Sequence, residues 1–141
     1  MFDVIVVGAD DSSTALRAVE AAVAIAAMSG GTLHIVSAFV LKNVPSAGVP
    51  DDVGLLDNEG QVDALLQELS FVAKAKGVEP ILHKVPPPPA ASLIKYAEEV
   101  GADLVVVGNR GMKGVRRLLG SVPNSVAHGA HCSVAIIDTT A

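Results

Sequence analysis

The chain has 141 residues, a length that suits one compact domain, and we expect a single domain over residues 1–141. Half of the residues are hydrophobic but only 3% are aromatic, a composition that excludes a disordered chain and predicts a core of Val, Ile, Leu and Ala. The net charge is −5, and an acidic protein without an extended basic face binds nucleic acids poorly, so we expect no nucleic-acid partner.

The first half of the chain alternates between strand and helix patterns. Residues 4–7 form an apolar run ended by Gly8, typical of a parallel strand buried on both faces. Ser12 and Ser13 can cap a helix that ends at Gly30, and a second strand is expected over residues 32–39. The apolar positions of this helix recur at helical spacing and are Leu16, Val19, Ala22, Val23, Ala26 and Ala27.

Residues 41–58 contain two prolines and two glycines without a clear period, and we expect them to form one long loop. A helix closed by Gly77 follows, and then an edge strand over residues 80–85. The helical apolar positions are Val62, Leu65, Leu66, Leu69 and Val72 or Ala73.

The proline run 86–89 is expected to be a stiff connector whose last proline opens the next helix, rather than a ligand for a partner domain. That helix ends at Gly101, and residues 104–107 form the fourth strand. A short helix begins near Ser121, and residues 133–138 form the fifth strand.

Strands that alternate with helices predict an α/β protein with a Rossmann-like, five-stranded parallel sheet and helices on both faces. We expect the strand order 3-2-1-4-5. Ligands of such sheets bind at the carboxyl ends of the strands, where the strand order reverses. The segment Gly8-Ala9-Asp10 and the loop that starts at Gly108 both lie at such ends, and they are neighbours if the first and fourth strands are adjacent.

The loop GNRGMKGVRRLLGS, residues 108–121, holds four glycines and four cations but no acid. It lacks the GxxxxGK[ST] pattern of a P-loop and the GxGxxG pattern of a dinucleotide fold, so hydride transfer is not expected. Glycines let backbone N–H groups face an anion, and Ser121 and Val122 lie where a helix begins with unsatisfied donors. The loop therefore suits a small phosphate-bearing ligand.

The stretches VVGADDSS and GNRG…GSVPNSV resemble the universal stress protein family, and the order of elements is similar over nearly the whole chain. The resemblance implies that Gly108 lies near a ribose, that Asp10 lies near the nucleotide, and that Ala38 and Phe39 face adenine. It places four residues around the phosphates: Gly111, Gly120, Ser121 and Val122. Ala9, Asn109 and Arg110 complete the candidate binding residues, with Arg110 available to neutralise phosphate.

ATP-binding members of that family have nine residues between the second and third glycine of this loop. Here eight residues, 112–119, separate Gly111 from Gly120. The text GN..G and LLGSVP also resembles members that bind cyclic AMP. ATP, with or without Mg²⁺, and cyclic AMP both remain candidate ligands.

The resemblance implies a regulatory or nucleotide-sequestering module of the stress response. One alternative is a weak ATPase or a phosphoryl- or adenylyl-transferring enzyme, but only Asp10 and Asp11 are plausible catalytic acids, so we favour binding over turnover and expect any ATP hydrolysis to be slow. A second alternative is a dimeric scaffold that binds no nucleotide, against which the intact Gly120-Ser121 pair argues.

His128, His131 and Cys132 suggest zinc or a Cys–His nucleophile, but neither a fourth ligand nor an orienting acid follows nearby, so we expect no metal site. His34 and His83 are interpreted as structural residues of strands.

The fifth strand bears on self-association. Between Val134 and Ile137 it is apolar on both faces, and an uncovered apolar edge strand promotes association. The family dimerises through this strand, so the resemblance implies a homodimer.

The amino-terminal residues MFDVIVVGADD lack a basic segment and a cleavage site, and no apolar run approaches the ~20 residues that cross a bilayer. The single cysteine, Cys132, excludes an internal disulfide and fits a reducing compartment. We therefore expect a cytoplasmic protein with no membrane partner.

Overall fold

A parallel sheet of five strands forms the centre of the computed structural model, which describes residues 1–10, 15–39, 41–43, 55–57, 59–109 and 122–139. The strands of this sheet are β1 (Val4–Gly8), β2 (Thr32–Ala38), β5 (Ile81–Val85), β6 (Leu104–Gly108) and β7 (Ser133–Ile137). Their order is β5-β2-β1-β6-β7, and every neighbouring pair is parallel. The predicted order 3-2-1-4-5 is confirmed, with β1 and β6 adjacent.

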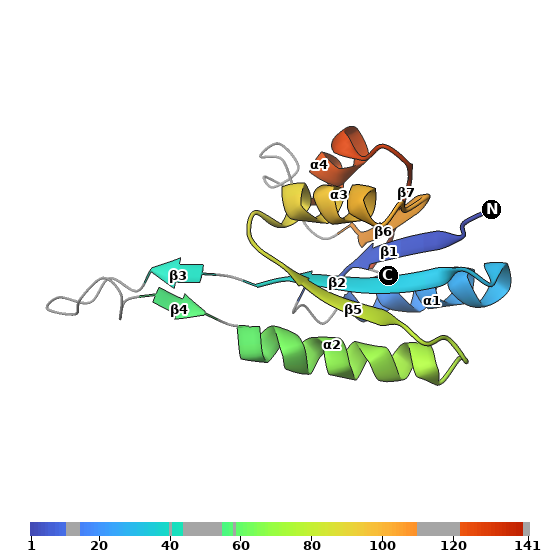
Figure 1. The fold of residues 1–141 in the computed structure, drawn as a ribbon, viewed down its shortest axis with the longest axis horizontal. Coiled ribbons are helices and arrows are strands. Elements are labelled where there is room, and N and C mark those ends of the chain that lie inside the picture. Colours follow the sequence, from blue (N-terminus) through green and yellow to red (C-terminus); the bar gives the residue numbers. More distant parts are fainter. Residues whose placement is uncertain (11–14, 40, 44–54, 58, 110–121, 140–141) are drawn as a thin grey trace, which may run out of the picture.

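Four helices cover the two faces of the sheet. They are α1 (Ala15–Ser29), α2 (Glu59–Lys74), α3 (Pro89–Glu99) and α4 (Val122–Gly129). Figure 1 shows α1 and α2 on one face and α3 and α4 on the other. Each face carries its own apolar core, because the central strands are buried on both sides. No helix in the described part of the chain is long and apolar enough to cross a bilayer.

Helix α1 packs on the sheet through a stripe of mostly small side chains. The buried residues of this stripe are Ala15, Ala18, Val19, Ala22, Val23 and Ala26. Leu16 and Ala27 were expected on this face, but Leu16 is 41% exposed and Ala27 is also exposed. Both lie one position away from the i, i+3, i+4 stripe, so the prediction for these two residues is wrong.

The ends of α2 and α3 follow the local sequence as predicted. Gly77 and Gly101 adopt positive φ angles of 77° and 70° just after these helices, a conformation that side-chain-bearing residues rarely adopt. Pro89 opens α3, where its missing N–H has no intrahelical partner to lose.

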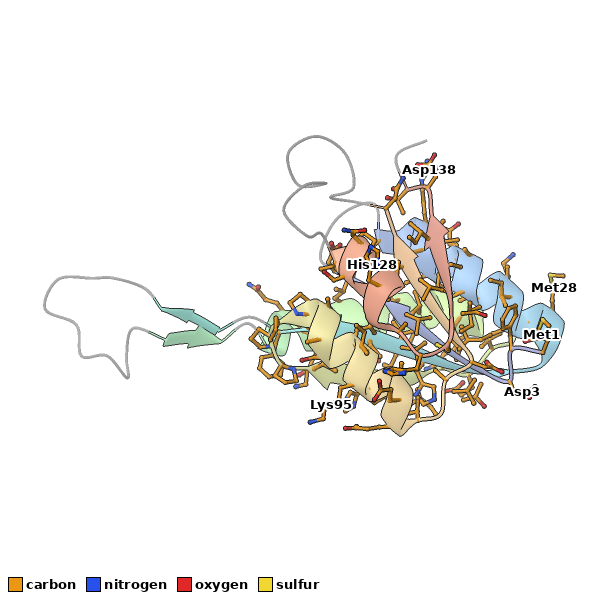
Figure 2. The ribbon with its side chains drawn as sticks, turned by 90° about the horizontal axis from the view of Figure 1, so that it is seen from above. Met1, Asp3, Met28, Lys95, His128 and Asp138 are labelled. Carbon is orange, nitrogen blue, oxygen red and sulfur yellow. The ribbon has the colours of Figure 1, made fainter. Side chains whose placement is uncertain are left out.

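Two short strands, β3 (Leu41–Asn43) and β4 (Leu55–Asp57), form a separate antiparallel ribbon. The prediction of one long loop over residues 41–58 is therefore wrong for these two segments, which are too short to display a two-residue period. Residues 44–54 and 58 lie outside the described residues. The ribbon projects from the body (Figure 1), away from the end where Met1, Asp3 and Met28 lie (Figure 2).

Smaller differences concern element ends. Strand β2 ends at Ala38, one residue before the predicted end, although the Phe39 N–H still donates to the Val85 carbonyl at 3.0 Å. Strand β7 ends at Ile137 rather than at residue 138. Ser12 and Ser13, the predicted helix caps, lie outside the described residues.

The Asp103 carboxylate joins the starts of β1 and β6. It accepts the backbone N–H groups of Asp3 and Val4 at 2.8 and 3.1 Å, while the Asp103 N–H donates to the Val4 carbonyl at 2.9 Å. These bonds favour the ionised carboxylate, and the bond from Asp3 contributes most to lowering its pKa. The amino-terminal strand is thereby tied to the strand that carries the glycine loop.

His34 and His83 contact Tyr96 of α3. The His34 ring is 7% exposed, and its Nδ1 lies 2.8 Å from the Tyr96 hydroxyl, while the His83 ring stacks on Tyr96 at 4.2 Å. Burial, and secondarily the nearby His83, lowers the pKa of His34, because the charged imidazolium is poorly solvated there. This geometry fits the structural interpretation of the two histidines.

We predict that His34 makes the folded state less stable in acid. Its folded pKa is lowered, so the unfolded chain binds more protons as pH falls below about 6.5, and stability decreases. Above that pH His34 does not reduce the free energy of unfolding. Below it, the free energy of unfolding falls by at most about 1.4 kcal/mol per pH unit because of this group. Urea unfolding between pH 8 and 5 should therefore give a smaller pH dependence for His34→Gln than for the wild type. Identical dependences would contradict the prediction.

Candidate nucleotide site

A cavity of about 310 Å³ opens at the carboxyl ends of the central strands. Residues after β1, at the end of β2 and at the end of β6 all line it, among them Ala9, Ala38 and Gly108. This is the position where the strand order reverses on the two sides of β1, the expected place for a ligand in such a sheet. Its size falls within the roughly 300–1,000 Å³ range of small-molecule pockets.

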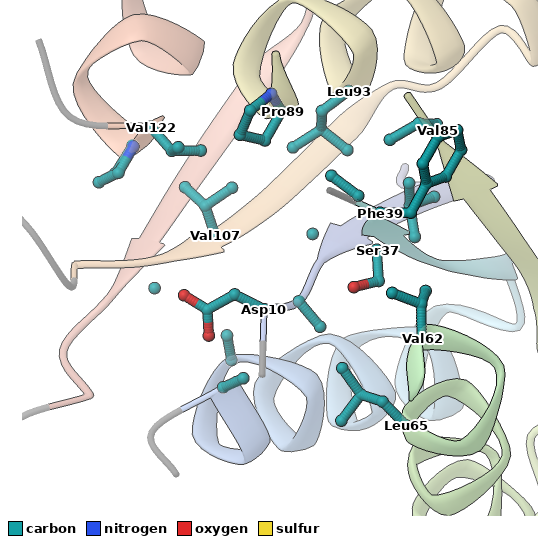
Figure 3. A pocket seen from close by; sticks show the side chains of 18 of the residues that line it. Asp10, Ser37, Phe39, Val62, Leu65, Val85, Pro89, Leu93, Val107 and Val122 are labelled. Atoms are coloured by element: carbon teal, nitrogen blue, oxygen red, sulfur yellow. The ribbon is translucent and has the colours of Figure 1, made fainter. Parts of the chain in front are cut away.

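Most of the cavity wall is apolar. Helix α2 contributes Val62 and Leu65, and α3 contributes Pro89 and Leu93, as Figure 3 shows. Asp10 is the charged side chain among the described lining residues. An apolar wall with few polar groups suits a flat ring system more than an ion alone.

Six of the candidate binding residues predicted from the sequence line this cavity: Ala9, Asp10, Ala38, Phe39, Gly108 and Val122. Four others, Arg110, Gly111, Gly120 and Ser121, lie outside the described residues. Contact of any of these residues with a nucleotide stays a prediction.

Asn109, the remaining candidate, holds the chain end that follows β7. Its Oδ1 accepts the backbone N–H and the hydroxyl of Thr139, each at 3.0 Å, and its Nδ2 donates to Asp138 at 3.1 Å. The Asn109 N–H donates to the Ile137 carbonyl at 2.9 Å. These bonds place buried Thr139 in the cavity wall.

Gly8 and Gly108 allow close packing beside the cavity. A Cβ atom on Gly8 would lie 2.8 Å from Leu93 Cδ2, and one on Gly108 would lie 2.8 Å from Thr139 Cγ2. In this structure the space beside the two glycines is therefore filled by the side chains of Leu93 and Thr139.

The sequence did not predict several of the lining residues, most of which come from segments other than those that follow β1 and β6. They include Val36, Ser37, Gln61, Val62, Leu65, Val85, Pro87, Leu93 and Thr139. Ser37 carried a usable signal, since it is a polar residue near the carboxyl end of an otherwise buried strand. The others needed the packing of α2 and α3 to be known.

Helix α4 begins beside the cavity, where Val122 and Pro123 form part of its wall. A helix of this kind presents unsatisfied N–H groups at its start and favours an anion by roughly 0.3–1 kcal/mol when exposed.

The histidines near the end of the chain do not converge on a metal site in the described residues. His131 Nε2 lies 2.8 Å from Glu98 Oε1 on the surface, and burial raises the pKa of the half-buried Cys132 thiol. Within the described ranges, no three His, Cys, Asp or Glu side chains gather in a group that could hold a metal ion.

The family model for the universal stress protein family matches residues 1–138. The chain belongs to this family. Among curated members, it is 34% identical to the universal stress protein Rv1636 of Mycobacterium tuberculosis, with 99% of this chain and 98% of the relative covered. It is 31% identical to the universal stress protein MJ0531 of Methanocaldococcus jannaschii, with 97% and 82% covered.

A solved structure described as a universal stress protein in complex with cAMP is 36% identical to this chain. The two superpose with a TM-score of 0.82, and the match covers 99% of both chains. The family and the α/β fold implied by the sequence resemblance are therefore confirmed.

We predict that Gly8→Ala destabilises the protein and narrows the cavity. The added Cβ must displace the end of the Leu93 side chain, which can shift toward the cavity, so we expect a cost near the lower end of the about 1–3 kcal/mol typical of overpacking. Gly60→Ala is the matched control, because Gly60 lies in α2 and a Cβ added there would meet no atom within 4 Å. Urea denaturation should show a lower midpoint for Gly8→Ala only, and equal midpoints for the two variants would contradict the packing argument.

Proposed function

We propose that this universal stress protein binds an adenine nucleotide in the crevice between the carboxyl ends of β1 and β6. The observation that carries the proposal is the cavity at the strand-order reversal, apolar toward α2 and α3 and bordered by Asp10 and the start of α4. A base suits the apolar part, and a phosphate suits the helix start.

The orientation of the ligand follows from this division of the wall. The base lies between the end of β2, with Ala38 and Phe39, and the apolar side chains of α2 and α3. The ribose lies near Gly108 and Asp10, and the phosphate lies toward Val122. Arg110, two residues after Gly108 in the sequence, is the cation that we expect to neutralise phosphate charge.

The ligand is cyclic AMP or ATP, the latter with Mg²⁺ held mainly by its phosphates. The complex of the 36% identical relative with cAMP supports the cyclic nucleotide. The described cavity presents Asp10 as its one carboxylate, and a second metal-holding acid is not among the described lining residues. Asp11, the other candidate acid, lies outside the described residues. We propose that the protein acts as a regulatory or nucleotide-sequestering module of the stress response and that any ATP hydrolysis is slow.

The proposal predicts stabilisation by nucleotide. At 100 times its dissociation constant a ligand adds about 2.7 kcal/mol to the unfolding free energy, which raises the midpoint of thermal unfolding by several degrees. The measurement is thermal unfolding with cyclic AMP and, separately, with ATP and Mg²⁺. Absence of a shift with both nucleotides at millimolar concentration would contradict nucleotide binding.

A variant that fills the cavity provides the control for this experiment. Ala38→Leu adds volume at a lining residue and should abolish the thermal shift, whereas Ala24→Leu adds the same volume on the exposed side of α1 and should retain it. Equal shifts for the two variants would place the ligand elsewhere.

We also propose that the protein forms a homodimer through β7. This strand is at one edge of the sheet, its outer side meets no described strand, and Ile136 is 38% exposed on it. Pairing with a second copy would cover an apolar edge between Val134 and Ile137.

The two sheet edges offer a matched test of this dimer. Ile136→Lys should convert a dimer into a monomer at micromolar concentration, because it puts a charge into the paired edge. Ile81→Lys changes a residue that is 46% exposed on the opposite edge strand and should leave the dimer intact. Light scattering after size exclusion gives the mass, and a monomeric wild type would contradict the proposal.

A further inference from the structure

The hydroxyl of Ser37 is an unpartnered polar group in the wall of the cavity. Ser37 is only 3% exposed, yet its side chain makes no hydrogen bond with any described residue. In the described residues, every fully buried side-chain oxygen has a hydrogen-bond partner. Because the Ser37 oxygen has none, it is not fully buried and keeps some accessible surface. The small accessible part of this residue therefore opens into the cavity, and Figure 3 shows the oxygen turned toward its interior.

Thr139 and Gln61, two other polar residues of the wall, are hydrogen-bonded or exposed to solvent. The Thr139 hydroxyl donates to Asn109 Oδ1 at 3.0 Å. Gln61 is exposed and reaches solvent. Ser70, a buried serine of α2 away from the cavity, donates to the Gln67 carbonyl at 2.7 Å. The Ser37 hydroxyl faces the cavity without a partner in the described protein, so it is the group in this wall that is available to a ligand atom.

The surroundings of Ser37 indicate which part of a ligand it meets. It lies on the β2 side of the cavity, with Phe39 and the α2 side chains Val62 and Leu65 nearby and Val122 at the far side (Figure 3). This is the apolar end assigned to the base. An apolar pocket with one hydroxyl holds a flat ring by burial and orients it through a polar atom on its edge.

We propose that the Ser37 hydroxyl hydrogen-bonds the polar edge of the bound adenine, its 6-amino group or N1, and so fixes the orientation of the base. This inference rests on the proposed nucleotide binding. A hydroxyl rotates freely and both donates and accepts, so it can pair with either atom. Ser37 is then a specificity-determining residue of the binding site, and adenine is preferred over a purine whose edge lacks these groups.

The test is a comparison of affinities by isothermal titration. The probes are cyclic AMP and two analogues, one without the 6-amino group and one with C–H in place of N1; the corresponding ATP analogues are used where the wild type prefers ATP. Ser37→Ala should weaken binding of the parent nucleotide by about 2- to 12-fold, the range of one neutral hydrogen bond. For the analogue that lacks the contacted atom, Ser37→Ala should change the affinity little.

Ser70→Ala is the control, because it makes the same chemical change at a buried serine outside the cavity and should leave all affinities unchanged. Parent affinity that is unchanged in Ser37→Ala overturns the inference while nucleotide binding stands. An equal loss for the parent and both analogues also overturns it, since that pattern reflects packing alone. A wild type that binds no nucleotide overturns the proposed function, and this inference with it.

Discussion

The burial of β1 between β2 and β6 is the constraint on which the rest of the structure depends. Ile5, Val6 and Val7 are fully buried, so this strand needs apolar cover on both faces. Right-handed crossovers run in one direction from β1 to β2 and β5, and in the opposite direction from β5 to β6 and β7, which puts α1 and α2 on one face and α3 and α4 on the other. The connections after β1 and β6 therefore leave in opposite directions, and the cavity lies between these two strand ends.

Small residues keep the layers close around this point. The alanine stripe of α1 and the absence of a side chain at Gly8 let helices approach the strand ends, and Leu93 packs directly over the glycine. At the neighbouring strand end, Asn109 holds Thr139 against Gly108 through hydrogen bonds. Close packing and the hydrogen bonds of Asn109 therefore hold this part of the cavity wall in place. Ligand sites are usually preformed in this way.

The polar groups near the cavity are few and differ in role. Asp10 and the start of α4 border one part, while the Ser37 hydroxyl lies within the apolar part beside α2. The apolar part suits a flat ring, and the helix start, rather than the Asp10 carboxylate, suits an anionic group.

The sequence by itself determined the fold class and the places of the main strands and helix ends, because buried runs such as residues 104–107 and glycine stops such as Gly101 are local signals. The strand order expected from the sequence is confirmed, whereas the ligand site stays a prediction. The sequence did not reveal the β3–β4 ribbon, whose strands are too short to show a period. Nor did it identify Ser37, Val62 or Leu93 as cavity residues. Only the tertiary structure decided that, since whether a side chain meets core or cavity depends on how distant helices pack across the strand ends.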